Sequence, residues 1–476
     1  MVNALHRKRG VVVKLADEWS GDCTAKGGAG VLEAFARRVG LWGSCRRLVA
    51  GRRGAGQGFE TTAVVSSLVH GLLCGGRGLS ATEPMRGDGP LLSLLGLDRA
   101  PSAETVEEVV KYLGGLGMEA SGLGRLVADF GARLLGREVR RDLLRDGFVM
   151  CFGDGSHLEV DGSRFEACSY HRDKGRGLDF GSVFVGPYVV ACDFAGEGEG
   201  EQKAVEWIVP GALAVLVRTG LRRDALMLMD SLYGHESTLK LLEDRERGVS
   251  YVVGANNLQR AMATLEDRPD GLWRAVKAGR GWERVEVCTF WLECEGWSGK
   301  RLCVGRRARR EGELLWRHFA LVTNLHRDDS RMKRLMREHK LCFEEAVWRL
   351  YDGKQGCENL WKDQLCDLGL HHPPSARVSA NAAFYAIAMV AANLAAGFRR
   401  LVLPAASRPM RLWRLRREII DMAATVARHG RCVLLRLRDA RTSMAWRGCE
   451  LRPLPARTTP VNSPSERQHQ RRTPQR

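Results

Sequence analysis

The chain has 476 residues and a mass of 52.8 kDa, and its 74 Lys and Arg against 56 Asp and Glu give a formal net charge of +18. Hydrophobic residues make up 44% and charged residues 27% of the chain, values that exclude a wholly disordered, collagen-like or coiled-coil protein. A positive charge of this size attracts polyanions such as nucleic acid, although a genome rich in G and C would also raise the share of Arg.

A membrane span and a cysteine-based site are both disfavoured. A span needs about 20 consecutive apolar residues, and the longest candidate, residues 382–398, is shorter and contains Tyr385 and Asn393. The 14 Cys are scattered without a Cys-x-x-Cys pair, which argues against zinc or thioredoxin-type sites. We expect reduced thiols, a cytoplasmic location and no membrane partner.

Residues 1–145 have the apolar periodicity of short helices. The clearest helical segment is 61–73, and Ser102 precedes a capping-box pattern that opens another helix. A third segment, 123–144, would expose Arg125, Arg133, Arg137, Arg140 and Arg141. A bundle of short basic helices is common in DNA-binding proteins and in purely structural ones, so this region alone leaves both interpretations open.

The sequence pattern changes near residue 146, where short apolar runs alternate with helical segments. Residues 148–152 form a buried strand that ends before Asp154, and residues 226–229 form another that ends before Asp230. Further strands are predicted at 183–185, 188–192 and 251–254, and helices at 204–217 and 236–243. Pro210 and Gly211 would interrupt the first of these helices. The acidic segment 197–201 is predicted to be a solvated turn.

Residues 263–330 are Trp-rich and strand-like. Helices are then predicted at 331–350, 356–365 and 380–398, followed by a final helix to about residue 429 and a last strand at 433–435. The segment 399–417 is strongly basic, and we expect Arg411 and Arg414 in it to contact DNA phosphates. Residues 451–476 are rich in Pro, Arg, Ser, Thr and Gln and are predicted to be disordered.

Three acids stand out for chemistry. Asp154 and Asp230 follow buried strands, and the carboxyl ends of neighbouring strands are where sites form. Glu358 would share a helix face with Lys354 and Lys362. Carboxylate oxygens suit Mg²⁺ or Mn²⁺, and two such ions activate water and stabilise a leaving 3′ oxygen. An Asp after a strand is more often a turn residue or a helix cap, so the residues alone leave that alternative open.

Several blocks together resemble the DDE transposases. Residues 153–160, 228–234 and 251–254 are similar to the strands of their catalytic core, and residues 322–325 and 351–363 are similar to their third block. The most specific part is the pattern Tyr351-x-x-Lys354-x-x-x-Glu358 after a strand-rich insertion. The nearest group is the insertion-sequence-four superfamily, in its thirteen-eighty branch, and the resemblance covers residues 25–440.

The resemblance implies an α/β fold with a ribonuclease H-like catalytic core, a β-rich insertion and a preceding helical DNA-binding region. It implies that Asp154, Asp230 and Glu358 are the catalytic residues and bind two Mg²⁺ ions, or Mn²⁺. It also implies that Tyr351 and Lys354 contact the DNA backbone, and Lys362 matches a Lys common in the branch. Lys354 stands where Arg is usual, and Leu365 where Lys is frequent.

Six regions are predicted along the chain. They are a helical DNA-binding region (1–145), the first part of the core (146–262), the β-rich insertion (263–330), the second part of the core (331–400), a basic C-terminal helical region (401–450) and the disordered tail (451–476).

The predicted function is a bacterial DNA transposase that cleaves the ends of an insertion sequence and joins them to target DNA. Its partners would be double-stranded DNA, as terminal inverted repeats and as target, and a second copy in a homodimeric synaptic complex. It would lie in the cytoplasm, at the nucleoid when bound. Two alternatives stay open: an inactive or recruited copy that only binds DNA, and a non-mobile ribonuclease H-like nuclease.

Overall fold

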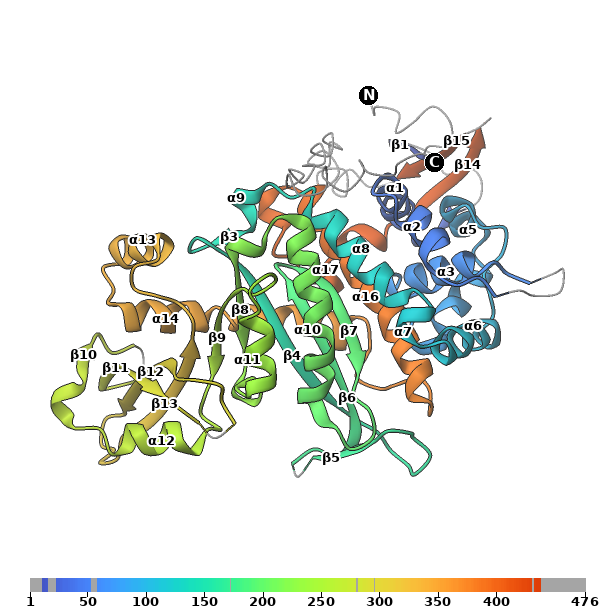
Figure 1. Ribbon diagram of the computed structural model, residues 1–476. Coiled ribbons are helices and arrows are strands. Elements are labelled where there is room, and N and C mark those ends of the chain that lie inside the picture. Colours follow the sequence, from blue (N-terminus) through green and yellow to red (C-terminus); the bar gives the residue numbers. More distant parts are fainter. Residues whose placement is uncertain are drawn as a thin grey trace, which may run out of the picture.

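The structure is a computed structural model that describes residues 11–15, 23–52, 58–171, 173–279, 281–294, 296–429 and 432–437. This part of the chain is a mixed α/β protein built around one large sheet, with a helical region on one side and a strand-rich extension on the other (Figure 1). The tail predicted at 451–476 lies outside the described residues, as does segment 438–450.

Short helices dominate the N-terminal region. They are α1 (Ala29–Arg38), α2 (Leu41–Leu48), α3 (Thr61–Leu73), α4 (Glu83–Arg86), α5 (Gly89–Leu95), α6 (Ala103–Gly115), α7 (Gly117–Ala120), α8 (Leu123–Leu135) and α9 (Arg140–Leu143). Ser102 caps α6 as predicted, since its hydroxyl accepts a hydrogen bond from the Thr105 N–H at 3.3 Å. The continuous helix predicted over 123–144 is wrong, because α8 ends before Gly136.

One sheet of 11 strands holds the core together. Its strands are β3 (Leu144–Arg145), β4 (Phe148–Glu159), β5 (Ser169–His171), β6 (Gly175–Val185), β7 (Tyr188–Phe194), β8 (Ala225–Met229), β9 (Ser250–Gly254), β10 (Arg274–Val276), β11 (Arg284–Leu292), β12 (Arg301–Arg309) and β13 (Arg317–Thr323). They run in the order β10-β11-β12-β13-β9-β8-β4-β6-β5, with β3 beside β4 and β7 beside β6. Strands β8 and β9 are parallel, as are β4 and β8. Parallel strands are covered on both faces, so the sequences of these central strands are continuous apolar runs.

Asp154 does not end its strand, contrary to the prediction. Strand β4 continues to Glu159 because it pairs antiparallel with the long β6, where Asp154 lies opposite Ser182. The parallel neighbour β8 stops earlier, with Met229 opposite Gly153. Asp154 therefore lies where one side of β4 loses its partner strand, and Asp230 follows the end of that partner.

The Trp-rich segment extends the central sheet instead of forming a sheet of its own. Its strands β10 to β13 form an antiparallel meander, and β13 pairs with β9 through Val322 and Val253. The short helix α12 (Gln259–Glu266) leads into it. In Figure 1 this extension forms the yellow end of the molecule, opposite the blue N-terminal helices.

Two predicted helix boundaries need correction. Helix α10 (Gly200–Thr219) runs through Pro210 without ending. Proline costs a helix interior about 3 kcal/mol, and the buried Val209 and Leu213, in a helix that packs on β6 and β7, outweigh that cost. The single helix predicted over 331–350 is two helices, α13 (Ser330–His339) and α14 (Phe343–Asp352), because Lys340 adopts a left-handed φ of 55° between them.

The C-terminal region differs most from the prediction. The chain continues from α15 (Gln355–Lys362) through a π-helical turn, η5 (Asp363–Asp367), to α16 (Val378–Leu401) and the short α17 (Leu412–Leu415). The final helix predicted to residue 429 is wrong, since Ala424–His429 is strand β14. It pairs with β15 (Cys432–Leu437) and β2 (Cys23–Thr24), and β15 pairs with β1 (Val11–Leu15). Partners from the other end of the chain decide this conformation.

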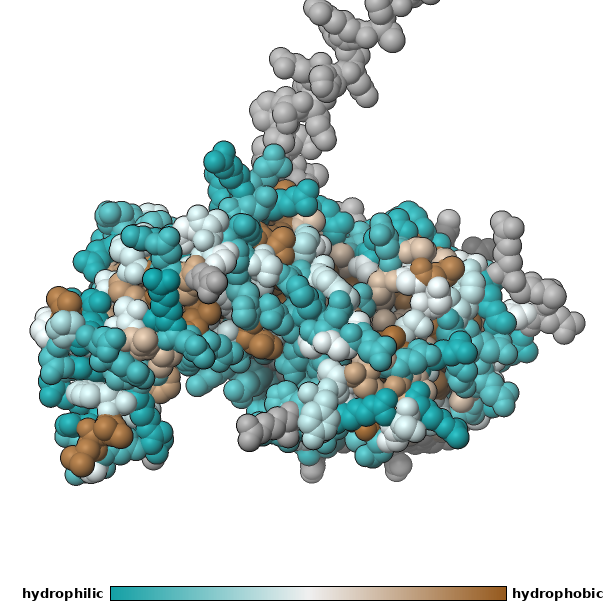
Figure 2. Space-filling view, turned by 60° about the horizontal axis from the view of Figure 1, so that its bottom comes forward, coloured by the Kyte–Doolittle hydropathy of each residue, from teal (hydrophilic) through white to brown (hydrophobic). Residues whose placement is uncertain are grey.

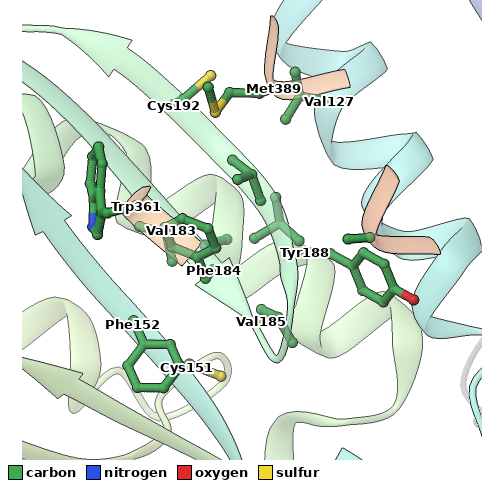
Figure 3. Close-up of a cluster of buried hydrophobic side chains, with 14 of the residues drawn as sticks. Val127, Cys151, Phe152, Val183, Phe184, Val185, Tyr188, Cys192, Trp361 and Met389 are labelled. Carbon is green, nitrogen blue, oxygen red and sulfur yellow. The ribbon is translucent and has the colours of Figure 1, made fainter. Parts of the chain in front are cut away.

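Helix α16 is the central helix of the hydrophobic core. By length and composition it could cross a membrane, yet most of it is buried against α3, α6, α8 and β7. Figure 3 shows its Met389 close to Val127 of α8 and Cys192 of β7. Its polar Asn393 is satisfied there, because the side-chain amide accepts from the Val189 N–H at 2.8 Å and donates to the Val189 carbonyl at 2.7 Å.

Candidate active site

The two predicted aspartates converge on one lysine. Asp154 and Asp230 follow directly after the paired residues Gly153 and Met229 of β4 and β8. The Nζ atom of Lys354 lies 3.6 Å from a carboxylate oxygen of each aspartate. Lys354 stands at the N-cap of α15, so the junction between α14 and α15 lies over this edge of the sheet.

Asp230 also has the local role that a residue after a strand commonly has. It caps the 3₁₀ turn η3 (Ser231–Tyr233), and its carboxylate accepts a hydrogen bond from the Ser231 N–H at 2.5 Å. Its side chain keeps 56% of its surface exposed, against 25% for Asp154. The turn therefore orients a carboxylate that remains open to a ligand.

The charge balance of the pair favours a further cation. Burial raises the pKa of Asp154, the ammonium of Lys354 lowers it, and the carboxylate of Asp230 raises it again. Burial likewise raises the pKa of Tyr351, as do the nearby carboxylates of Asp230 and Asp154. Two carboxylates thus share one ammonium, and desolvation disfavours the charged form of Asp154.

Glu358, the third predicted carboxylate, is not brought to this pair. It lies in the first turn of α15 with 68% of its side chain exposed, and its partner is Lys362 at 3.8 Å. Among the described residues, the ligand atoms of Asp154, Asp230 and Glu358 do not form a group within 4.8 Å of one another.

Of the two predicted DNA-contacting arginines, Arg411 is tied into the protein. Its guanidinium lies 2.7 Å from the Asp363 carboxylate and 2.9 Å from that of Asp367, which fastens α17 to the turn η5. Arg414 is half exposed and pairs with Glu418 at 2.6 Å. The contacts predicted for these arginines, for Tyr351 and for both lysines stay predictions about a DNA complex.

Two residues near the pair were missed at the sequence level. Glu201, in the acidic segment predicted to be a turn, lies in the first turn of α10, and Tyr233 ends η3. A Cβ built on Gly155 would come within 2.9 Å of both the Glu201 Cβ and the Tyr233 hydroxyl. Nothing in the run of Gly and Glu around residue 200 distinguishes Glu201, because this contact exists only in the folded chain.

An open cavity of about 550 Å³ lies beside this site, between the core and the strand-rich extension. Gln202, His235 and Lys240 line it from the core, and Cys294 and Trp297 from the extension. The face of the molecule drawn in Figure 2 is mostly hydrophilic, with apolar residues in small separate patches. The cavity is an open cleft whose lining combines polar side chains of the core with the apolar Leu258 and Trp297.

The site fits a divalent cation. Asp154 and Asp230 direct carboxylate oxygens toward one point, and such oxygens are the ligands that Mg²⁺ and Mn²⁺ prefer. The buried hydroxyl of Tyr233, whose proton has no acceptor among the described residues, adds an unused donor beside them.

A mixed α/β fold with paired carboxylates at the end of parallel strands is typical of metal-dependent enzymes. The family described as Transposase DDE domain group 1 matches residues 200–446, more than half of the chain. The chain therefore belongs to this family of DDE transposases, whose members use divalent metal ions to cleave and transfer DNA. The match includes Asp230, Tyr351, Lys354 and Glu358, and Asp154 precedes it.

Comparisons with other collections of proteins add little. No curated protein matches the chain. A cryo-EM structure of the piggyBac transposase synaptic complex with hairpin DNA is similar over 84% of this chain and 83% of that chain, with 11% sequence identity and a TM-score of 0.35. A likeness of this extent carries no weight for the fold or the function of this chain.

Proposed function

We propose that this chain is a transposase of the insertion-sequence-four superfamily, in its thirteen-eighty branch. It cleaves DNA at the ends of a bacterial insertion sequence and joins the freed ends to target DNA. The observation that carries this proposal is the convergence of Asp154, Asp230 and Lys354 at the end of two parallel strands, in a chain of the DDE transposase family.

The acidic residues of the site bind metal ions, and its basic residue and tyrosine contact the DNA. Asp154 and Asp230 bind divalent ions, two Mg²⁺ or Mn²⁺, with Glu358 as the third carboxylate when α15 turns toward the pair. Such ions, when bound, supply Lewis-acid activation of water and stabilise the leaving 3′ oxygen. Lys354 neutralises the two carboxylates in the free protein, and its ammonium is then available to a DNA phosphate. Tyr351 orients the backbone near the cleaved bond.

The remaining regions bind and position DNA. The excess of basic residues neutralises phosphates, and we assign this role to the N-terminal helices, to Lys362 and to the basic segment that contains Arg411 and Arg414. The ribonuclease H-like core carries the chemistry, and the β-rich insertion lies beside it. Joining two ends requires two active sites, so the working form is a homodimer on paired inverted repeats, in the bacterial cytoplasm at the nucleoid.

One substitution tests this function directly. Purified protein is incubated with a duplex that carries the element's terminal inverted repeat and with Mg²⁺ or Mn²⁺. The wild type should nick the duplex at the repeat end, and Asp230→Asn should abolish nicking while leaving DNA binding unchanged. Glu104→Gln, which alters an exposed acid on α6 far along the chain from the site, is the matched control. Nicking by Asp230→Asn at the wild-type rate would overturn the assignment.

A DNA-binding copy without catalytic activity is the second candidate. The observation that favours it is the separation of Glu358 from the pair, together with Lys354 and Leu365 at positions where relatives usually carry Arg and Lys. Strand transfer by the wild type in the presence of Mg²⁺ excludes this candidate. Binding of inverted-repeat DNA with no nicking in either metal supports it.

A further inference from the structure

Glu201 reaches the strand that carries Asp154. It is the second residue of α10, directly after Gly200, whose φ of +75° turns the chain into the helix. At Gly155, the residue after Asp154, an added Cβ would lie 2.9 Å from the Glu201 Cβ and 3.3 Å from its Cγ. A side chain at position 155 would push Glu201 away, so glycine there allows helix and strand to meet.

A buried donor beside these acids lacks a partner. Tyr233 is only 1% exposed, and its hydroxyl proton has no acceptor among the described residues, although the Gly155 N–H lies near its oxygen. The same Cβ at Gly155 would lie 2.9 Å from this hydroxyl. Burial raises the pKa of Tyr233 well above its usual value, and the carboxylates of Asp154 and Glu201 raise it further. The hydroxyl therefore keeps its proton, and an unused buried O–H points to an oxygen-bearing ligand.

The groups on the other side of Glu201 are already engaged with each other. His157 Nδ1 lies 2.7 Å from Asp179 Oδ1, and Nε2 lies 3.2 Å from the Gly175 carbonyl. Ser169 donates to the second oxygen of Asp179. The ligand atoms of His157, Asp179 and Glu201 lie within 4.8 Å of one another, but only the Glu201 carboxylate is held by a single surface contact, with Lys174 at 3.7 Å. His157 and Asp179 thus satisfy each other, and the Glu201 carboxylate keeps its oxygens for another partner.

We propose that Glu201 is a further ligand of the divalent cation bound at Asp154, and that Tyr233 donates a hydrogen bond to a water or phosphate oxygen in that site. This inference rests on the proposed function and goes beyond the three acids assigned there. It places one carboxylate on α10, one within β4 and one after β8, around the point where β4 continues beyond the end of β8. Metal binding in the absence of DNA then depends on Glu201 and does not depend on Glu358.

The test measures Mn²⁺ binding by the full chain without DNA. The EPR signal of free Mn²⁺ reports how much of the ion remains unbound. Glu201→Gln and Asp154→Asn should each weaken Mn²⁺ binding by about tenfold or more, and Tyr233→Phe by a smaller factor. Glu197→Gln, in the same acidic segment and exposed, is the matched control and should bind as the wild type does. Glu358→Gln should also bind normally. Thermal unfolding without metal shows whether each variant is folded.

Each outcome decides a separate statement. If Asp154→Asn loses Mn²⁺ while a folded Glu201→Gln binds it as tightly as the wild type, the role of Glu201 is overturned and the proposed function stands. If Asp154→Asn binds as the wild type does, the carboxylate pair holds no ion, and the proposed function fails together with this inference. If Glu358→Gln, and not Glu201→Gln, loses Mn²⁺, the third ligand is Glu358 alone.

Discussion

The strand-rich extension and the active-site edge differ in how their charged side chains are paired. In the extension the charges are paired within the fold, whereas at the edge they are only partly paired. In the extension, Arg307 pairs with Glu286 at 2.5 Å and with Asp270 at 2.6 Å, and its guanidinium stacks on Trp316 at 4.4 Å. At the active-site edge, Asp154 and Asp230 share one lysine at 3.6 Å. The arginines that make the chain so basic therefore include structural ones, whereas the acids at the edge are left with charge for a ligand.

A second example lies where the extension meets the core. Arg301 of β12 pairs with Glu236 at 2.6 Å and with Glu243 at 2.8 Å, and it stacks on Trp297 at 4.9 Å. Both acids belong to the segment around α11 (Glu236–Leu242) of the core. This cluster fastens the extension beside the cavity. Net charge is thus a poor guide to which arginines contact DNA, since pairing inside the fold consumes several.

Removing Arg307 should have the largest effect on stability. Arg307→Met removes the buried partner of Glu286, whose side chain is 3% exposed, and leaves it only the half-exposed Arg284 at 2.7 Å. Breaking a buried pair costs about 3–5 kcal/mol, and the remaining pair places the loss near the lower end of that range. We expect the free energy of unfolding in urea to fall by that amount. The double variant Arg307→Met/Glu286→Leu should recover most of the loss. A fall below about 1 kcal/mol for the single variant, the value of an exposed pair, would contradict a buried structural role.

Asp193 of β7 should make the stability of the protein depend on pH. Burial raises its pKa to about 6, against about 3.9 in the unfolded chain. The folded protein therefore takes up this proton first, and stability should rise by about 2 kcal/mol as the pH falls from about 7 to about 4. Asp193→Asn should remove this contribution and be more stable than the wild type at pH 8. Parallel pH profiles of unfolding for the two proteins would contradict the prediction.

Glu236, in the cluster with Arg301, should behave in the opposite way. Burial raises its pKa, but hydrogen bonds from Ser298 and Arg301 outweigh burial and lower the pKa to about 2. Its contribution to stability is present above the unfolded pKa and is lost as the pH falls from about 4.5 toward 2. Unfolding measured between pH 5 and 2 should show a loss that Glu236→Gln lacks. If Glu236→Gln loses as much stability in acid as the wild type does, the acid sensitivity does not come from Glu236.

At the active site, function should cost stability. Asp154→Asn removes a carboxylate whose pKa burial has raised, so the metal-free variant should be more stable than the wild type at pH 7.5. Urea denaturation without metal measures the difference, with Glu104→Gln as the control for losing an acid. A variant less stable than the wild type would mean that the contact with Lys354 outweighs the burial of the carboxylate.

The strands of the core were predictable because buried strands are continuous apolar runs. The runs before Asp154 and Asp230 predict β4 and β8 and place both acids on one edge. The continuation of β4 to Glu159 could not be predicted, since it depends on pairing with β6. Strand β14 was mistaken for a helix because it pairs with β15, which follows directly, and with β2 from the N-terminal part of the chain.

The site was only partly predictable from the sequence. Asp230, Tyr351, Lys354 and Glu358 lie in recognisable blocks, yet no pattern says that Lys354 bridges the aspartates while Glu358 pairs with Lys362. Glu201 sits among four other residues of a Gly and Glu run that is typical of solvated turns. Its position follows from the packing of α10 against Gly155, a contact between distant segments that local patterns do not encode.

The smallest effect on stability is expected for a substitution of Lys362 on α15, which tests DNA binding apart from folding. Lys362 and Glu358 form an exposed pair one helical turn apart, and such pairs contribute about 0.2–0.5 kcal/mol. Lys362→Ala should therefore leave the free energy of unfolding almost unchanged. If Lys362 contacts a phosphate, the variant should weaken binding of inverted-repeat DNA and reduce the salt dependence by about one charge. Unchanged affinity at every salt concentration would leave Lys362 as a solvated partner of Glu358.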